Sequence, residues 1–215
     1  MTAINCLVTR DGSTGYLLSD TAMAAAAGET TPIGFTFKSV TLPHSKSVCA
    51  FRGTHAFLVP MAILAASFAS FDEMASGFGP RWFAAMAQTP EAFRKSDIVG
   101  MGWSESNQRV RAFVARSTGD FTPEFHDLIL CPDISLEEVH FSDFDGRVEF
   151  FNVEADLLRI MKAQRARALR ADDIDSRGVI GGAAVLTIIN RHESSQRVIH
   201  RWPDVIGQPI NLTST

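Results

Sequence analysis

The chain has 215 residues, of which 46% are apolar, 20% are charged and 9% are aromatic. This apolar fraction, with a formal net charge of only −4, excludes disorder as the main state and predicts a packed core. The 20 lysines and arginines do not outnumber the 24 acids, so nucleic-acid binding is not expected. We predict a single domain over residues 1–215, because no repeat or linker-like stretch interrupts the chain.

The N-terminal sequence and the cysteine count predict a soluble, cytoplasmic protein. The first eight residues lack the basic segment and long apolar segment of a signal peptide. The most apolar stretch, 55–70, is shorter than the roughly 20 residues that a membrane helix needs, so no membrane partner is expected. The three cysteines form no CxxC motif and are odd in number, which favours free, buried thiols over a disulfide framework.

The first fifty residues predict short strands rather than a helix. Residues 4–9 and 16–18 are β-prone and flank the turn-forming segment 11–15, which indicates a hairpin. Further strands are predicted over 35–42 and 46–51, with a turn at 43–45 between them. Four strands before any helix is not the alternating order of a parallel sheet.

Two helices are predicted next. Thr54 is a candidate N-cap for a helix that extends to about Ser70 and is apolar nearly all round, which is typical of a helix packed between two layers. The second helix is predicted over 80–93, since Pro80 suits a first-turn position.

The second half predicts a hairpin, a long helix and a final hairpin. Segments 97–104 and 109–116 flank a polar turn, and 118–146 is predicted as loop with one or two short strands. Asn152 is a candidate cap for a helix over 153–170, whose acids lie early and whose bases, among them Arg165, lie late, as the helix dipole favours. Segments 183–189 and 196–202 are predicted as strands.

Several segments, taken in this order, resemble the proteasome β-subunit family of the N-terminal-nucleophile (Ntn) hydrolases. They are Thr2 to Thr21, the strand that contains Lys38, the Ala50-Phe51-Arg52-Gly53 end of the next strand, and Gly181-Gly182 with the hairpin that follows. The resemblance covers the chain almost end to end in element order, and at residue level it is strongest over 2–55 and 179–204. It implies an α+β fold, a four-layer αββα sandwich of two mainly antiparallel sheets.

The resemblance implies that Thr2 is the catalytic nucleophile. In the family a threonine becomes the first residue, its hydroxyl attacks an amide carbonyl, and its own α-amine acts as the base. Thr2 directly follows the initiator methionine and is small enough to be exposed by removal of Met1, so no propeptide is expected. A Met-Thr start is also common in proteins without this chemistry.

The resemblance also implies a supporting pair, Asp20 and Lys38. Asp20 would hold a charged lysine near the nucleophile, and it could equally be a turn or capping aspartate. Strand alternation places Lys38 on one face with Val40, while a gap-free count back from Gly53 places Ser39 at the family's lysine position. A one-residue bulge would put Lys38 in the site, and without one Lys38 would point away, with Lys46 as a distant substitute.

Gly53 matches the glycine whose backbone N–H forms the oxyanion hole in the family, although a glycine at a helix entry needs no such role. The chain departs from the family before Gly181, where an aspartate and a serine are expected. Asp175 and Ser176 lie nearby but displaced, and Ser142 is a loose substitute for another supporting serine.

These residues predict an amide-bond (peptide) hydrolase of the threonine type, acting on a peptide or small amide substrate. The alternative is a catalytically silent relative that keeps the fold for assembly or binding. No metal or cofactor is expected, because the six histidines show no metal-ligand spacing and no nucleotide-binding glycine motif is present. We further expect a homo-oligomer that uses surface aromatic residues, with Phe71, Phe78 and Phe83 as candidates.

Overall fold

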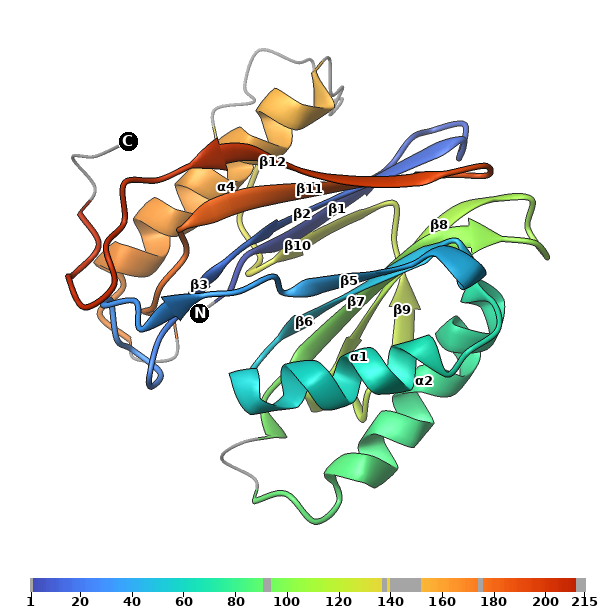
Figure 1. Ribbon diagram of the computed structural model, residues 1–215, viewed down its shortest axis with the longest axis horizontal. Coiled ribbons are helices and arrows are strands. Elements are labelled where there is room, and N and C mark those ends of the chain that lie inside the picture. Colours follow the sequence, from blue (N-terminus) through green and yellow to red (C-terminus); the bar gives the residue numbers. More distant parts are fainter. Residues whose placement is uncertain (1, 91–93, 137–138, 140–151, 174–175, 212–215) are drawn as a thin grey trace.

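A computed structural model describes residues 2–90, 94–136, 139, 152–173 and 176–211. The protein is a mixed α/β structure with two five-stranded antiparallel sheets that lie face to face (Figure 1). Helix α4 (Val153–Arg170) lies beside the first sheet, and helices α1 (Leu58–Ala66) and α2 (Phe71–Met86) lie beside the second, on the opposite side of the molecule. No helix within the described ranges combines the length and apolar character that a membrane crossing requires.

The first sheet joins the two ends of the chain. Its strand order is β10 (Leu128–Cys131), β1 (Ile4–Val8), β2 (Thr14–Asp20), β11 (Ala183–Asn190) and β12 (Ser194–Arg201). The β1–β2 and β11–β12 hairpins predicted from the sequence are both present. Because β2 pairs with β11, Ala184 lies opposite Asp20, and the Gly181-Gly182 segment that precedes β11 reaches the end of β2.

The second sheet is built from the middle of the chain. Its order is β5 (Ser39–Leu42), β6 (Ser47–Arg52), β7 (Asp97–Ser104), β8 (Arg109–Arg116) and β9 (Pro123–Phe125). The predicted strands 97–104 and 109–116 are confirmed at both ends. The short strands β9 and β10 agree with the prediction for 118–146, of which 137–138 and 140–146 lie outside the described residues.

The predicted single strand over 35–42 is wrong, because the chain leaves the strand conformation in the middle of it. Gly34–Phe35 forms β4, which pairs with β3 (Ala22–Met23) in a separate two-stranded sheet. Residues 36–38 have no strand assignment, and β5 begins only at Ser39. Lys38 therefore lies just before a strand and does not have to follow its alternation.

Three apolar clusters hold the sheets and helices together. The central cluster joins the two sheets and includes Ile4 and Leu17 from the first and Val99 from the second. A second cluster joins the second sheet to two helices, and a third joins the first sheet to the last helix. The fully buried side chains in these clusters account for most of the burial that stabilises the fold.

The first predicted helix is shorter and more exposed than its sequence indicated. A 3₁₀ turn (η2, His55–Phe57) follows Thr54, and α1 spans Leu58–Ala66. Only Met61 and Ala65 are buried, whereas Val59 and Ile63 are 65% and 68% exposed. The prediction of a helix packed on all sides is therefore wrong, since high hydrophobicity does not determine which faces a neighbour covers.

The second predicted helix begins nine residues earlier than expected. Helix α2 spans Phe71–Met86, with Pro80 in its interior rather than in its first turn. The start is set by Ser70, whose hydroxyl accepts a 3.1 Å hydrogen bond from the backbone N–H of Glu73, as in a capping box. The predicted end at residue 93 lies outside the described residues.

The aromatic residues proposed for an oligomer interface are not all at the surface. Phe71 and Phe78 are core residues of α2, and only Phe83 is exposed, so two of the three are unavailable for an interface.

The last helix is confirmed. Helix α4 spans Val153–Arg170, and the Asn152 side chain accepts a 3.2 Å hydrogen bond from the N–H of Ala155. Its buried residues are Leu157, Ile160, Met161, Gln164, Arg165 and Ala168. Two polar side chains therefore lie on the face that packs against the first sheet.

Candidate functional site

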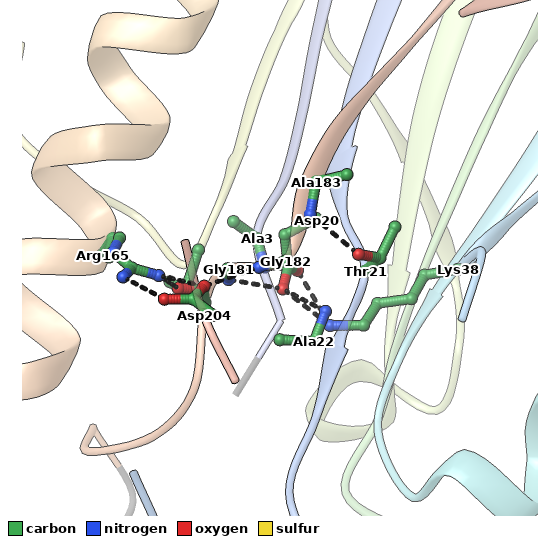
Figure 2. A network of polar contacts seen from close by, with 11 residues as sticks. Ala3, Asp20, Thr21, Ala22, Lys38, Arg165, Gly181, Gly182, Ala183 and Asp204 are labelled. Atoms are coloured by element: carbon green, nitrogen blue, oxygen red, sulfur yellow. Dashed lines mark hydrogen bonds and ion pairs between the residues drawn. The ribbon is translucent and has the colours of Figure 1, made fainter. Parts of the chain in front are cut away.

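The candidate site lies at the end of β2 that carries Asp20, next to the start of β1. The Asp20 side chain is fully buried, and both of its oxygens bind the ammonium of Lys38, at 2.9 and 3.0 Å from Nζ. Figure 2 shows the Lys38 side chain extended toward Asp20. The structure therefore brings these two predicted site residues together, and the catalytic role of the pair stays a prediction.

Three backbone N–H groups complete the surroundings of the Asp20 carboxylate. Ala3 donates to Oδ1 at 2.9 Å, while Ala22 and Gly181 each donate to Oδ2 at 3.1 Å (Figure 2). Ala3 lies just before β1, Ala22 lies two residues after Asp20, and Gly181 lies in the segment before β11. Both oxygens of this buried carboxylate therefore have hydrogen-bond donors from the backbone.

The Lys38 ammonium has fewer hydrogen-bond partners among the described residues than the Asp20 carboxylate has. Only 5% of the residue is exposed, and both hydrogen bonds that its Nζ makes with the described residues go to Asp20. Burial lowers the pKa of Lys38 from its usual value, because desolvation penalises the charged form, and the Asp20 carboxylate offsets part of this effect. The Asp20 carboxylate is therefore the group that offsets the cost of burying the Lys38 ammonium.

Ser39, the alternative at the lysine position, directs its side chain toward β12 and not toward Asp20. Its hydroxyl accepts a 3.2 Å hydrogen bond from the side chain of Gln196 on β12, and its backbone pairs with Ala50. The side-chain alternation assumed a strand that continues through 35–42, whereas β5 begins at Ser39, so Lys38 lies outside the strand, and its side chain reaches Asp20.

Thr2 lies directly before the Ala3 amide that binds Asp20. The residue is buried, at 7% exposed, and the backbone of Ala3 also accepts a 3.2 Å hydrogen bond from the N–H of Asp20. These two contacts fix the chain at the residue after Thr2. Met1, whose removal the predicted chemistry requires, lies outside the described residues.

Gly53 follows β6 at a position where the backbone angle and the neighbouring side chains both favour glycine. Its φ of 156° is one that glycine favours, and a Cβ at this position would lie 2.8 Å from both the Phe51 ring and the Ser96 side chain. Local packing is therefore sufficient to require glycine here, and the oxyanion role stays a prediction. The neighbouring Arg52 is held by Asp97 across the strand pair, with 2.6 Å between Nη1 and Oδ2.

Of the residues named as candidates for support before Gly181, only Ser176 is described, and it is engaged elsewhere. Ser176 bonds to Asp173 through both its hydroxyl and its N–H, in a local turn. Asp175 and Ser142 lie outside the described residues. In contrast, a buried ion pair that the sequence analysis missed, Arg165 and Asp204, lies against the Gly181-Gly182 segment.

A sequence signal for Arg165 was present. Leu157, Met161 and Arg165 follow one another at four-residue spacing, so Arg165 occupies a position that the helical period assigns to the buried face. The sequence analysis considered Arg165 only as one of the late bases that the helix dipole favours, and its side chain is 1% exposed. No comparable signal marks Asp204, which follows the last strand.

An apolar groove of about 350 Å³ is lined in part by residues that are neighbours of Lys38 in the sequence. Its strand side is formed by Phe37, Ser39 and Val40, which flank Lys38 in sequence, and its other side is formed by α1. Phe37 is 57% exposed, so the groove presents apolar surface to solvent. Among the described residues, no group of three or more His, Cys, Asp or Glu side chains could hold a metal ion.

The fold is proteasome-like. The structure is similar to that of the Gly-1 mutant of Anbu from Hyphomicrobium sp. strain MC1, with a TM-score of 0.66 over 95% of this chain and 90% of that one. The two sequences are 14% identical, so the likeness bears on the fold alone. No protein-family model matches the chain, and no curated protein matches it by sequence.

Proposed function

We propose that this protein is an amide-bond hydrolase whose nucleophile is the hydroxyl of Thr2 and whose base is the α-amine of Thr2, freed by removal of Met1. The observation that carries the proposal is the shared carboxylate of Asp20. It binds the Lys38 ammonium and the N–H of Ala3, the residue after Thr2. The Lys38 ammonium and the residue after the nucleophile are thereby held by one carboxylate, just before β1.

The chemistry needs no group beyond these residues and water. The Thr2 hydroxyl oxygen attacks the carbonyl carbon of the substrate amide, and its proton passes to the α-amine, whose ordinary pKa of about 7.7–8.0 leaves part of it neutral at pH 7. The positive charge of Lys38 favours the developing alkoxide. The carbonyl oxygen becomes an oxyanion, for which the Gly53 N–H is the proposed donor.

The intermediate then collapses and the enzyme is regenerated. The C–N bond breaks, and the leaving amine takes the proton from the α-ammonium, which leaves an ester on Thr2. Water attacks this ester while the α-amine accepts its proton. The second collapse returns a proton to the Thr2 oxygen and releases the carboxylic acid.

Three finer points belong to the same proposal. The two sheets with helices on their outer sides form the four-layer αββα sandwich of the Ntn hydrolases. The groove between β5 and α1 takes an apolar side chain of a peptide substrate, because its strand side adjoins Lys38. The protein is a homo-oligomer, and light scattering at micromolar concentration should give a mass above 23.5 kDa; a monomer mass would contradict this.

One observation favours a second candidate, a silent relative that keeps the fold for assembly. The segment before Gly181 lacks the aspartate and serine that the resemblance implies, and Ser176 is engaged with Asp173. In that case the Asp20–Lys38 pair is structural.

The test uses protein whose loss of Met1 is verified by intact mass. A peptide β-lactone should acylate Thr2, giving one adduct that maps to the N-terminal peptide. Thr2→Ala should take no label, Thr2→Ser should keep part of the rate, and Lys38→Met should lose most of it. Lys46→Met is the matched control, because the exposed Lys46 ammonium binds Glu105 rather than Asp20. A processed wild-type protein that takes no label and cleaves no peptide would contradict the hydrolase and leave the silent relative.

A further inference from the structure

A buried ion pair lies on the far side of the Gly181-Gly182 segment from Asp20. Arg165 on α4 binds Asp204 through two hydrogen bonds, 2.9 Å from Nη1 to Oδ2 and 2.7 Å from Nη2 to Oδ1. The two side chains are 1% and 2% exposed, and the Arg165 guanidinium lies 5.2 Å from the centre of the Trp202 ring. We call this pair the Arg165–Asp204 clamp.

The clamp holds the backbone of residues 180–182. Arg165 Nη1 donates to the carbonyl oxygen of Ile180 at 2.6 Å, and the N–H of Gly182 donates to Asp204 Oδ2 at 2.7 Å. A Cβ on Gly181 would collide with both Asp204 Oδ2 and Arg165 Nη1, so the backbone approaches the ion pair as closely as glycine allows. The segment 180–182 is therefore fixed on one side by two charged groups.

The same segment binds Asp20 and its neighbours on the other side. The Gly181 N–H donates to Asp20 Oδ2, and the Gly181 carbonyl accepts from the N–H groups of Thr21 and Ala22, each at 3.1 Å. Figure 2 shows the resulting sequence of contacts from Arg165 and Asp204 through Gly181 to Asp20 and Lys38. A shift of the segment would therefore move a donor of the carboxylate that holds the lysine.

We propose that Arg165 and Asp204 are positioning residues. Through the Gly181-Gly182 backbone, they hold Asp20 and Lys38 in the arrangement that the proposed catalysis needs. The inference rests on the proposed hydrolase function. It assigns to the clamp the role of holding this segment in place beside Asp20, whereas Ser176, the nearest described candidate from the sequence, bonds to Asp173. A buried ion pair adds little net stability over apolar side chains of similar volume, so its benefit here is the geometry that it imposes.

The experiment compares the full chain with Asp204→Asn, Arg165→Lys and the double variant Arg165→Met/Asp204→Leu. The double variant removes both charges together and avoids a lone buried charge, and Asp204→Asn keeps the side-chain shape if the double variant does not fold. Ile160→Val is the control, because it trims a buried side chain of the same helix without changing the clamp.

Two measurements are made on each variant. The first is the ¹H–¹⁵N resonances of Ala3, Ala22 and Gly181, whose N–H groups all bind Asp20. The second is inactivation by the β-lactone, resolved into a binding constant and a maximal rate.

Clamp variants that fold should shift all three amide resonances and lower the maximal inactivation rate about 10- to 100-fold, as a small misplacement of reacting groups does. The binding constant should change less than twofold, and Ile160→Val should change none of these readouts. Unshifted resonances with an unchanged maximal rate in a folded clamp variant would overturn the proposal. If the wild type takes no label, the hydrolase proposal fails, and the three resonances still decide whether the clamp positions Asp20.

Discussion

Asp20 and Lys38 should contribute unequally to stability, although they form one ion pair. In Asp20→Asn, one oxygen becomes an NH₂ group that cannot accept a hydrogen bond. Oδ1 takes one backbone N–H and Oδ2 takes two, so either orientation of the amide leaves at least one buried donor without an acceptor. Such a group costs about 1–3 kcal/mol, and removing one partner of a buried ion pair costs about 3–5 kcal/mol in all. We expect Asp20→Asn to lower the free energy of unfolding by about 4 kcal/mol.

Lys38→Met should have a smaller effect. The carboxylate of Asp20 keeps three backbone donors, and methionine fills most of the volume of the lysine without the cost of burying an ammonium. The expected loss is about 1.5–3 kcal/mol, the net contribution of a hydrogen bond to a charged group. The two variants should therefore differ by roughly 1–2.5 kcal/mol.

Urea unfolding at pH 7, followed by circular dichroism and tryptophan fluorescence, measures both values. Ser39→Ala serves as the control for disturbance of β5, since its hydroxyl bonds to Gln196. A loss in Lys38→Met equal to or larger than that in Asp20→Asn would refute the reasoning, because it would mean that the lysine, and not the three amides, keeps the carboxylate in place.

Further predictions concern the thiols, a histidine and a helix cap. Burial raises the pKa of all three cysteine thiols, to about 12 for Cys49 and Cys131, so iodoacetamide at pH 8 should modify none in the native protein and three after denaturation, as mass spectrometry would show. Burial and nearby positive charges lower the pKa of His200 below 6.5, so the unfolded state takes up a proton first as the pH falls. The free energy of unfolding should therefore decrease below about pH 6.5, and urea titrations between pH 5 and 8 should show less of this decrease in His200→Gln. Ser70→Ala should cost about 1 kcal/mol in thermal or urea unfolding, because it removes the acceptor at the start of α2, and Ser70→Asp should restore most of it.

The elements that could be predicted from the sequence are those with strong local signals at both ends. The β7–β8 hairpin has a polar turn between two apolar strands, and α4 has the Asn152 cap with acids early and bases late. In α2 two local signals competed, and the Ser70 cap determined the start while Pro80 was accommodated inside the helix. The exposure of α1 had no local signal, because which faces of an apolar helix are covered depends on elements elsewhere in the chain.

The candidate site shows the same limit more clearly, because its contacts span the chain. The donors to Asp20 are separated from it by 2, 17, 18 and 161 residues, and the members of the clamp are 39 residues apart. Asp20 and Lys38 could be named in advance only because a resemblance supplied the pairing, and the choice between Lys38 and Ser39 depended on a break in the strand that no residue pattern indicated. A carboxylate whose donors come from four separate segments requires each segment to be held in place independently. For the segment 180–182 one such support is Arg165 on the buried face of α4, which donates to the Ile180 carbonyl while Asp204 pairs with its charge.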